Sequence, residues 1–184
     1  TTDPNFFEVF DFEFVSGDKS TALKEPHSLV LTESMAKKYF GDTDAVGEVI
    51  EKTSFGPVKI TGVIKDQPTN SHLAFDLLFS QVATGDGWND YLNKWDAFGA
   101  YTYIVLNRGH SVETLRSNMP ELEKEKFTQF QGAVSIDFQA VEDIYLHSAD
   151  IEEGTEVTHG QLSYIYIFSS MGIFLLLIAC MNYI

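Results

Sequence analysis

The longest hydrophobic stretch of the chain lies at its C-terminal end, where residues 164–184 read YIYIFSSMGIFLLLIACMNYI. This stretch contains no charged residue and no proline. A helix needs about 20 apolar residues to cross the hydrocarbon core of a bilayer. A buried helix of the same length normally keeps a polar stripe, which this run lacks. The pattern therefore predicts a transmembrane helix over 162–184, preceded by a domain over 1–161 outside the membrane.

Shorter segments of this domain alternate between apolar and polar residues, which is the period of a half-buried strand. In the first of them, Phe10, Phe12 and Phe14 alternate with Asp11 and Glu13. The strands predicted in this way cover 6–15, 28–32, 48–52, 58–65, 73–79, 101–107 and 134–141.

Two further segments have helical periodicity, one directly after the predicted strand 28–32 and one after a turn that follows the predicted strand 101–107. Thr32 is placed to cap a helix over 33–40, and Gly41 is placed to end it. Ser111 is placed to cap a second helix over 112–127, which we expect Pro120 to kink or split. The order of elements predicts an α+β domain with one or two split βαβ units.

The distribution of charge predicts on which side of the membrane the domain lies. Lys126 is the last basic residue, whereas seven acidic residues follow it before the hydrophobic run. Cytoplasmic flanks of membrane spans are enriched in Lys and Arg. We therefore predict that 1–161 are non-cytoplasmic and that the helix runs inward. Because the N-terminal sequence TTDPNFF has no features of a signal peptide, we expect a signal or first span upstream and further membrane sequence downstream.

Composition narrows the possible partners. The net charge of −15 argues against nucleic acid, whose binding proteins carry basic patches, and against docking on anionic lipid. The single cysteine, Cys180, lies in the predicted span, so the domain forms no internal disulfide or cysteine-based metal site. Such a domain fits a bacterial periplasm.

Motifs for catalysis or cofactor binding are missing from this sequence. It contains neither a P-loop nor a GxSxG motif, and its five histidines are scattered singly. Acidic residues at 150–156 do not have the spacing of an EF-hand loop, and Asp11 and Glu13 are explained by alternation on an exposed strand face. We predict no catalytic residue, no cofactor and no metal, and thus no enzyme activity in this chain.

Four aromatic residues occur among Gly and Asn in the segment 80–100, which has no clear period: Trp88, Tyr91, Trp95 and Phe98. Such residues could line a ligand cleft or a partner surface, or pack under a loop as part of the core. We treat them as the candidate partner or substrate surface and keep core packing as the alternative.

Several strings of the sequence, taken in order, resemble a known family. They are NFFEVFDFEFVSGD (5–18), ALKEP (22–26), VLTESMAKKYFGD (30–42), GVIKDQPTNSH (62–72) followed by FD, and EDIYLHS (142–148). Together they resemble the MacB-like periplasmic core domain, in the versions common in Bacteroidota. The closing IACMNYI resembles the start of the second membrane helix of FtsX-like ABC-transporter permeases.

This resemblance implies a permease subunit of the bacterial inner membrane, with 1–161 in the periplasm. Its domain would combine a porter-like lobe of split βαβ units with a smaller, β-rich inserted lobe, around 42–72. The implied partners are a separate or fused ABC ATPase, a second permease in a homo- or heterodimer, and a periplasmic substrate or protein. The family supplies no catalytic residues.

Two other classes of function remain open from the residues alone. An extracellular sensor domain of a membrane signalling protein would also have a span and an acidic flank. A membrane-anchored hydrolase is disfavoured, because no nucleophile and base occur in a recognisable arrangement.

Overall fold

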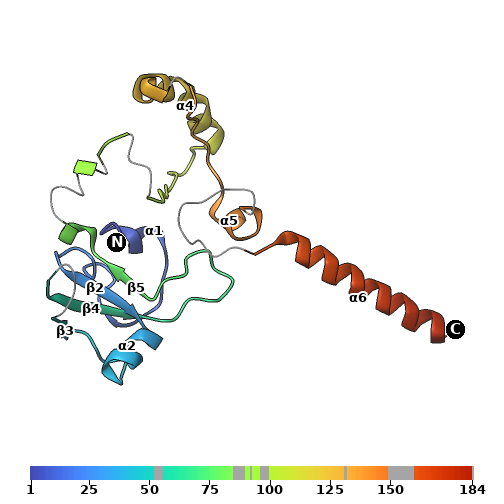
Figure 1. Ribbon diagram of the computed structural model, residues 1–184, viewed down its shortest axis with the longest axis horizontal. Helices are drawn as coiled ribbons and strands as arrows, with labels where there is room; N and C mark the ends of the chain where they lie inside the picture. The colour runs from blue at the N-terminus through green and yellow to red at the C-terminus, as the bar shows by residue number, and fades with distance from the viewer. Residues whose placement is uncertain are drawn as a thin grey trace. The chain divides into compact units, whose positions relative to one another are not determined.

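The computed structural model describes residues 1–51, 56–84, 90–91, 93–95, 100–130, 132–148 and 160–183 (Figure 1). These residues form a mixed α+β structure. It divides into two compact units, one of Thr1–Gln67 with Phe75–Phe138 and the other of Pro68–Ala74 with Gln139–Ile184. The two units are described separately below.

The first unit is built on one sheet in the order β1-β4-β2-β5, with β3 also pairing with β4. Strand β4 runs parallel to β2 and antiparallel to β1 and β3, and β2 runs antiparallel to β5. The strands are β1 (Phe14–Gly17), β2 (Ser28–Thr32), β3 (Val49–Ile50), β4 (Val58–Ile64) and β5 (Leu77–Phe79). The parallel pair β2 and β4, with the helix between them in sequence, forms one of the predicted βαβ units.

Both faces of the sheet are buried, as the fully buried strand β2 requires. Leu29 and Leu31 of β2 pack on one side with Met35 and Ala36 of α2 (Glu33–Phe40). Val30 faces the opposite side. There it lies in a second cluster with Phe7, Ala22, Leu23, Ile64 and Leu78. Burying each Val, Leu or Ile side chain stabilises the fold by about 1.5–3 kcal/mol before the entropy cost.

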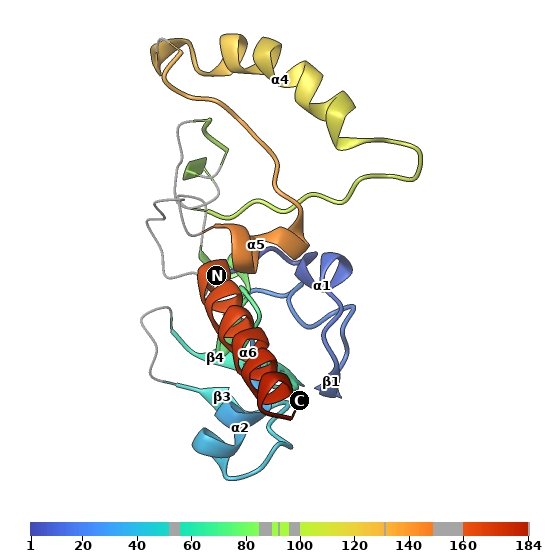
Figure 2. The ribbon, with the colours of Figure 1, turned by 90° about the vertical axis from the view of Figure 1, so that its right-hand side faces the viewer.

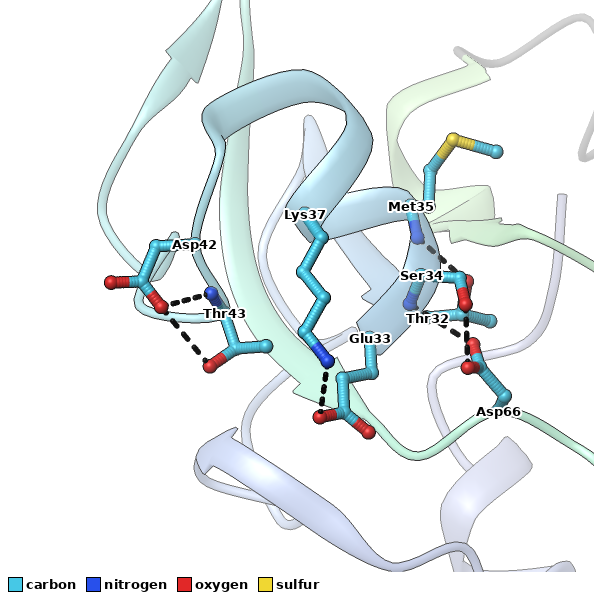
Figure 3. Close-up of polar contacts among 8 residues, drawn as sticks. All are labelled: Thr32, Glu33, Ser34, Met35, Lys37, Asp42, Thr43 and Asp66. Atoms are coloured by element: carbon cyan, nitrogen blue, oxygen red, sulfur yellow. Dashed lines mark hydrogen bonds and ion pairs between the residues drawn. The ribbon is translucent and has the colours of Figure 1, made fainter.

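Helix α2 confirms the prediction for 33–40, including both of its ends. The Thr32 hydroxyl accepts a hydrogen bond from the Met35 backbone N–H at 3.3 Å, and Gly41 has φ 78°. The carboxylate of Asp66, which lies just after β4, accepts two further hydrogen bonds from the N–H and the hydroxyl of Ser34, at 3.0 and 2.6 Å (Figure 3). The end of β4 is thus bonded directly to the start of the helix.

The prediction of one strand over 6–15 was wrong for residues 6–13. Residues Phe6–Val9 form a short helix, α1, and the strand begins only at Phe14, where pairing with Ile64 of β4 starts. The helical turn brings the rings of Phe6 and Phe10 to 5.0 Å, while Phe7 lies 4.8 Å from Phe14. These ring contacts bury apolar area in a segment that has no strand partner.

Other predicted strands are shorter than expected or lack a partner. Within the predicted strands 48–52 and 73–79, only the residues of β3 and β5 pair with a neighbouring strand. Residues 101–107 and 134–140 belong to no strand or helix, although the exposure of 134–139 alternates residue by residue. Val141, expected to end a strand, begins helix α5 (Val141–His147). Hydrophobic alternation is satisfied by one covered face, whereas a strand also needs a hydrogen-bonded neighbour.

Helix α4 (Val112–Lys126) confirms the second predicted helix, with the Ser111 hydroxyl accepting from the Thr114 N–H at 3.3 Å. Pro120 lies inside α4 without splitting it. Short 3₁₀ helices, η1 (Gln81–Thr84) and η2 (Thr128–Phe130), complete the first unit. The predicted lobe at 42–72 remains a prediction; β3 and β4 of that stretch belong to the main sheet.

The second unit contains α5 and the apolar helix α6 (Leu162–Tyr183), coloured orange and red in Figure 2. Helix α6 confirms that the C-terminal run is helical. It is 22 residues long, and none of its most hydrophobic window is buried in the structure. Within the described part of the chain it is the one helix long and apolar enough to cross a membrane.

Candidate interaction surface

Trp95 is the best-defined member of the predicted aromatic group. Its side chain is 48% exposed, and its ring stands edge-on to the ring of Phe127, 6.0 Å between centroids, at 90°. The Lys126 ammonium lies 5.8 Å from the centre of the indole ring. A cation over an exposed aromatic ring contributes about 0.5–1 kcal/mol. Trp95 is therefore held on one edge and open to solvent on another.

The C-terminal end of α4 positions the residues beneath Trp95. The Phe127 N–H donates to the Glu123 carbonyl at 2.9 Å, and the Thr128 hydroxyl donates to the Lys124 carbonyl at 3.0 Å. These bonds satisfy carbonyls of the last helical turn. Phe127 is 7% exposed and also contacts the ring of Phe130 at 6.1 Å. The capped helix end thus gives Trp95 a fixed, buried neighbour.

Helix α4 is in turn fastened to the segment that follows it. Arg116 donates from Nε to the Asp137 carboxylate at 2.8 Å and from its terminal nitrogen to the Phe138 carbonyl. The Arg116 hydrogen bond is the main reason that the pKa of Asp137 is lowered. Next to Asp137 in the same segment, 134–140, the Ile136 N–H donates to the Glu123 carboxylate at 2.6 Å. Side chains of α4 therefore replace the strand neighbour that this segment lacks.

The other predicted surface residues have different outcomes. Tyr91 is 37% exposed, so it is available at the surface. Trp88 and Phe98 lie outside the described residues. The candidate interaction surface, as far as the structure describes it, consists of the exposed Tyr91 and of Trp95, which Lys126 and Phe127 contact. The sequence did not single out Lys126 or Phe127 for this surface, because they lie some 30 positions from Trp95.

The carboxylates Asp11 and Glu13 do not form a catalytic pair. Each has a separate cationic partner at 2.5 Å, Lys19 for Asp11 and Lys65 for Glu13, and both carboxylates are well exposed. The hydrogen bond from Lys19 lowers the pKa of Asp11. Exposed ion pairs of this kind contribute little to stability. These ion pairs explain the two acidic side chains, so no catalytic role is needed to explain them.

No group of three or more His, Cys, Asp or Glu residues that could hold a metal ion occurs in the described ranges. His147 lies 3.4 Å from Asp143, one helical turn away, which is an ion pair only when the imidazole is protonated. The acidic residues at 150–156 lie outside the described residues.

Comparison with known proteins identifies the domain. Residues 1–122, about two thirds of the chain, match the family model of the MacB-like periplasmic core domain. The chain belongs to this family. The match covers the whole sheet, helix α2 and most of α4, so the βαβ unit described above is part of the family's domain. A search of curated proteins finds no match to this chain.

Two solved structures are similar to the chain. One is a domain of a proposed permease protein from Porphyromonas gingivalis, with 24% identity and a TM-score of 0.48, covering 67% of this chain and 56% of its own. The other is the periplasmic region of MacB from Actinobacillus actinomycetemcomitans, with 16% identity and a TM-score of 0.41, covering 73% and 64%. The chain spans less than two thirds of the length of either solved chain.

Proposed function

We propose that this chain is the periplasmic domain and adjoining membrane span of an ABC-transporter permease subunit in the bacterial inner membrane. The observation that carries the proposal is the order of two features. A MacB-like periplasmic core domain over 1–122 is followed by an uncharged, fully exposed helix of 22 residues. A family domain tethered in this way can pass movement between the membrane and the periplasm.

In this proposal, ATP hydrolysis occurs on a separate subunit or domain on the cytoplasmic side. The permease works as a homo- or heterodimer. Its periplasmic domain couples hydrolysis to export of a substrate or to mechanical work on a periplasmic partner. Support for the orientation comes from the charge pattern, since no Lys or Arg lies between Lys126 and α6.

The test is purification of the full-length, tagged protein from detergent-solubilised membranes. We expect a nucleotide-binding subunit to copurify and the preparation to hydrolyse ATP in a vanadate-sensitive manner. A preparation without ATPase activity, from a gene that encodes no ATPase domain, would contradict the permease function. That result would favour the extracellular sensor domain instead.

Within this function, the surface at Tyr91 and Trp95 is where we place contact with substrate or partner protein. A half-exposed aromatic side chain resting on a buried ring resembles the anchors that dominate many interfaces. A photo-crosslinking residue at position 95 of the full-length protein should give crosslinked species in cells. The matched control is position 39, because Tyr39 is 60% exposed on α2. Equal crosslinking at both positions, or none at 95, would contradict this placement.

A further inference from the structure

Gly160 lies two residues before the first residue of α6 and contacts helix α5. Its backbone N–H donates to the Tyr145 carbonyl at 2.7 Å. Only Gln161 separates Gly160 from α6, and the Gln161 carbonyl accepts from the Tyr164 N–H within the first turn, at 3.1 Å. The hydrogen bond at Gly160 therefore ties α5 to the start of the apolar helix.

The side chains of Tyr145 and Leu146 of α5 approach Gly160 so closely that a larger residue would require them to shift. A Cβ atom at this position would lie 2.8 Å from Cε1 and 3.2 Å from Cζ of the Tyr145 ring, and 3.3 Å from Cδ2 of Leu146. Gly160 is not among the glycines with positive φ, so its backbone conformation does not itself require glycine. Close approach of the Tyr145 ring is the physical reason for a glycine here.

The C-terminal end of helix α5 is also bonded to the segment that precedes the helix. The Ser148 hydroxyl, in a residue only 1% exposed, donates to the Gln139 side-chain carbonyl at 3.3 Å. The Gln139 amide donates to the His147 carbonyl at 3.5 Å. These bonds join Gln139, two residues before α5, to the residues at the C-terminal end of the helix. Helix α5 is thus fixed both to the chain that precedes it and to Gly160.

We propose that the Tyr145–Gly160 contact is a clasp that makes α5 and the start of α6 move as one body. Movement of the membrane helix then reaches Gln139 through α5, bypassing residues 149–159. The clasp goes beyond the proposed function by naming the residues that would transmit the movement. It rests on that function only for the source of the movement, which is ATP hydrolysis by the partner subunit.

The test is hydrogen exchange, by mass spectrometry, on the full-length protein in lipid nanodiscs. We expect Gly160→Val to speed exchange in peptides covering 141–148 and 160–163 by about tenfold or more. Gly172→Val is the matched control, because a Cβ at Gly172 of α6 would meet nothing within 4 Å. Unchanged exchange in the Gly160→Val variant would overturn the clasp.

A double-mutant cycle separates the ring contact from general damage. Gly160→Ala should speed exchange strongly in the native background and by less than about twofold in the Tyr145→Ala background, since the ring it strikes is gone. Tyr145→Phe, which keeps the ring, should behave like the native protein. Additive effects of Gly160→Ala and Tyr145→Ala would overturn the contact.

Whether α5 and the start of α6 move as one body is tested separately from whether the protein is a transporter. When vanadate traps the ATPase complex, protection of the Gly160 region should persist. A tenfold loss of protection in the trapped state would show that the clasp opens, which overturns the proposal. If no ATPase copurifies but the double-mutant cycle holds, the clasp stands and the permease function fails. If an ATPase copurifies but the effects in the double-mutant cycle are additive, the permease function stands and the clasp fails.

Discussion

His27 is the one non-glycine residue with positive φ in the described part of the chain, at 57°. It lies immediately before β2, is exposed, and offers its carbonyl to the Lys59 N–H at 2.8 Å. The hydrogen bond joins β2 to β4 at the start of their parallel pairing. The conformation therefore serves the sheet, although an L-residue adopts it at a cost of about 1–2 kcal/mol.

His27→Gly should raise the stability of the protein slightly. Glycine removes the left-handed strain but is more flexible in the unfolded chain, which offsets about 0.5–1 kcal/mol. We expect a net gain of about 0.5 kcal/mol, seen as a rise of about 1–2 °C in thermal unfolding of the detergent-solubilised protein. His110→Gly is the control, because His110 is also exposed but lacks positive φ. A lower Tm for His27→Gly would contradict the argument.

Gly17→Ala should be far more destabilising than Gly41→Ala. Both glycines have positive φ, at 92° and 78°, so both variants carry the same left-handed strain. At Gly17 the added Cβ would also lie 2.5 Å from the Thr61 carbonyl oxygen, whereas at Gly41 it meets nothing within 4 Å. The β1–β4 pair must separate to accept it.

We expect Gly17→Ala to cost at least about 2 kcal/mol and Gly41→Ala about 1 kcal/mol. Urea unfolding of the two variants, followed by circular dichroism, measures the difference. Equal losses would mean that β1 shifts freely to accommodate the methyl group, and that its pairing contributes little to the fold.

At the scale of elements, helix α2 depends on a residue outside itself. Two of its orphan N–H groups find acceptors, one on Thr32 and the other on Asp66, which lies 32 positions beyond Ser34. The hydrogen bonds from the hydroxyl and the N–H of Ser34 lower the pKa of Asp66. The carboxylate also favours the positive end of the helix dipole. Folding of α2 and completion of β4 are therefore coupled.

Asp66→Ala should destabilise the first unit by about 0.5–1 kcal/mol near pH 7, after allowance for solvent screening of this exposed carboxylate. Because the folded pKa lies below the unfolded value of about 3.9, the stabilisation is complete above that value. It is lost as pH falls through the folded pKa. The difference in stability between native and variant protein should thus shrink as the pH is lowered from 7 to 2.5. A difference that stays constant over this range would point to a loss of packing.

At the scale of the whole molecule, the decisive prediction is orientation across the membrane. In the proposed topology α4 is periplasmic and α6 lies in the bilayer. Glu113→Cys, at an exposed site on α4, should react with a membrane-impermeant maleimide in intact cells when Cys180 is replaced by serine. Cys180 itself, in the α6 span, should not react. Labelling of the position-113 cysteine only after cell lysis would reverse the orientation.

Helices α2 and α6 show how much local signals can decide. At α2, a capping threonine, an apolar stripe at helical spacing and a terminal glycine lie within ten residues. Helix α6 is a continuous apolar run. Hydrogen bonds of a helix connect residues four apart, so its signals are contained in the segment itself. Strand β2 was equally predictable from its own sequence, because it is a short apolar run that ends where a helix begins.

Segments 6–15, 101–107 and 134–140 mark where local signals were insufficient. Segments 6–15 and 134–140 alternate as strands do, and 101–107 is a nearly continuous apolar run. A strand's hydrogen bonds, however, go to a distant neighbour that its own sequence does not name. Only the tertiary structure decided that β4 takes Phe14 as a partner, and that Arg116 and Glu123 bond residues 136–138.

For the candidate surface and the clasp, too, the sequence determined some features and the tertiary structure decided the others. The sequence determined the long apolar C-terminal helix, the acidic flank and the aromatic character of 88–98, because these depend on composition and order alone. Only the tertiary structure placed Trp95 against Phe127, and Gly160 under the ring of Tyr145. Those contacts join residues 32 and 15 positions apart, and their energies depend on distances that only the folded chain sets.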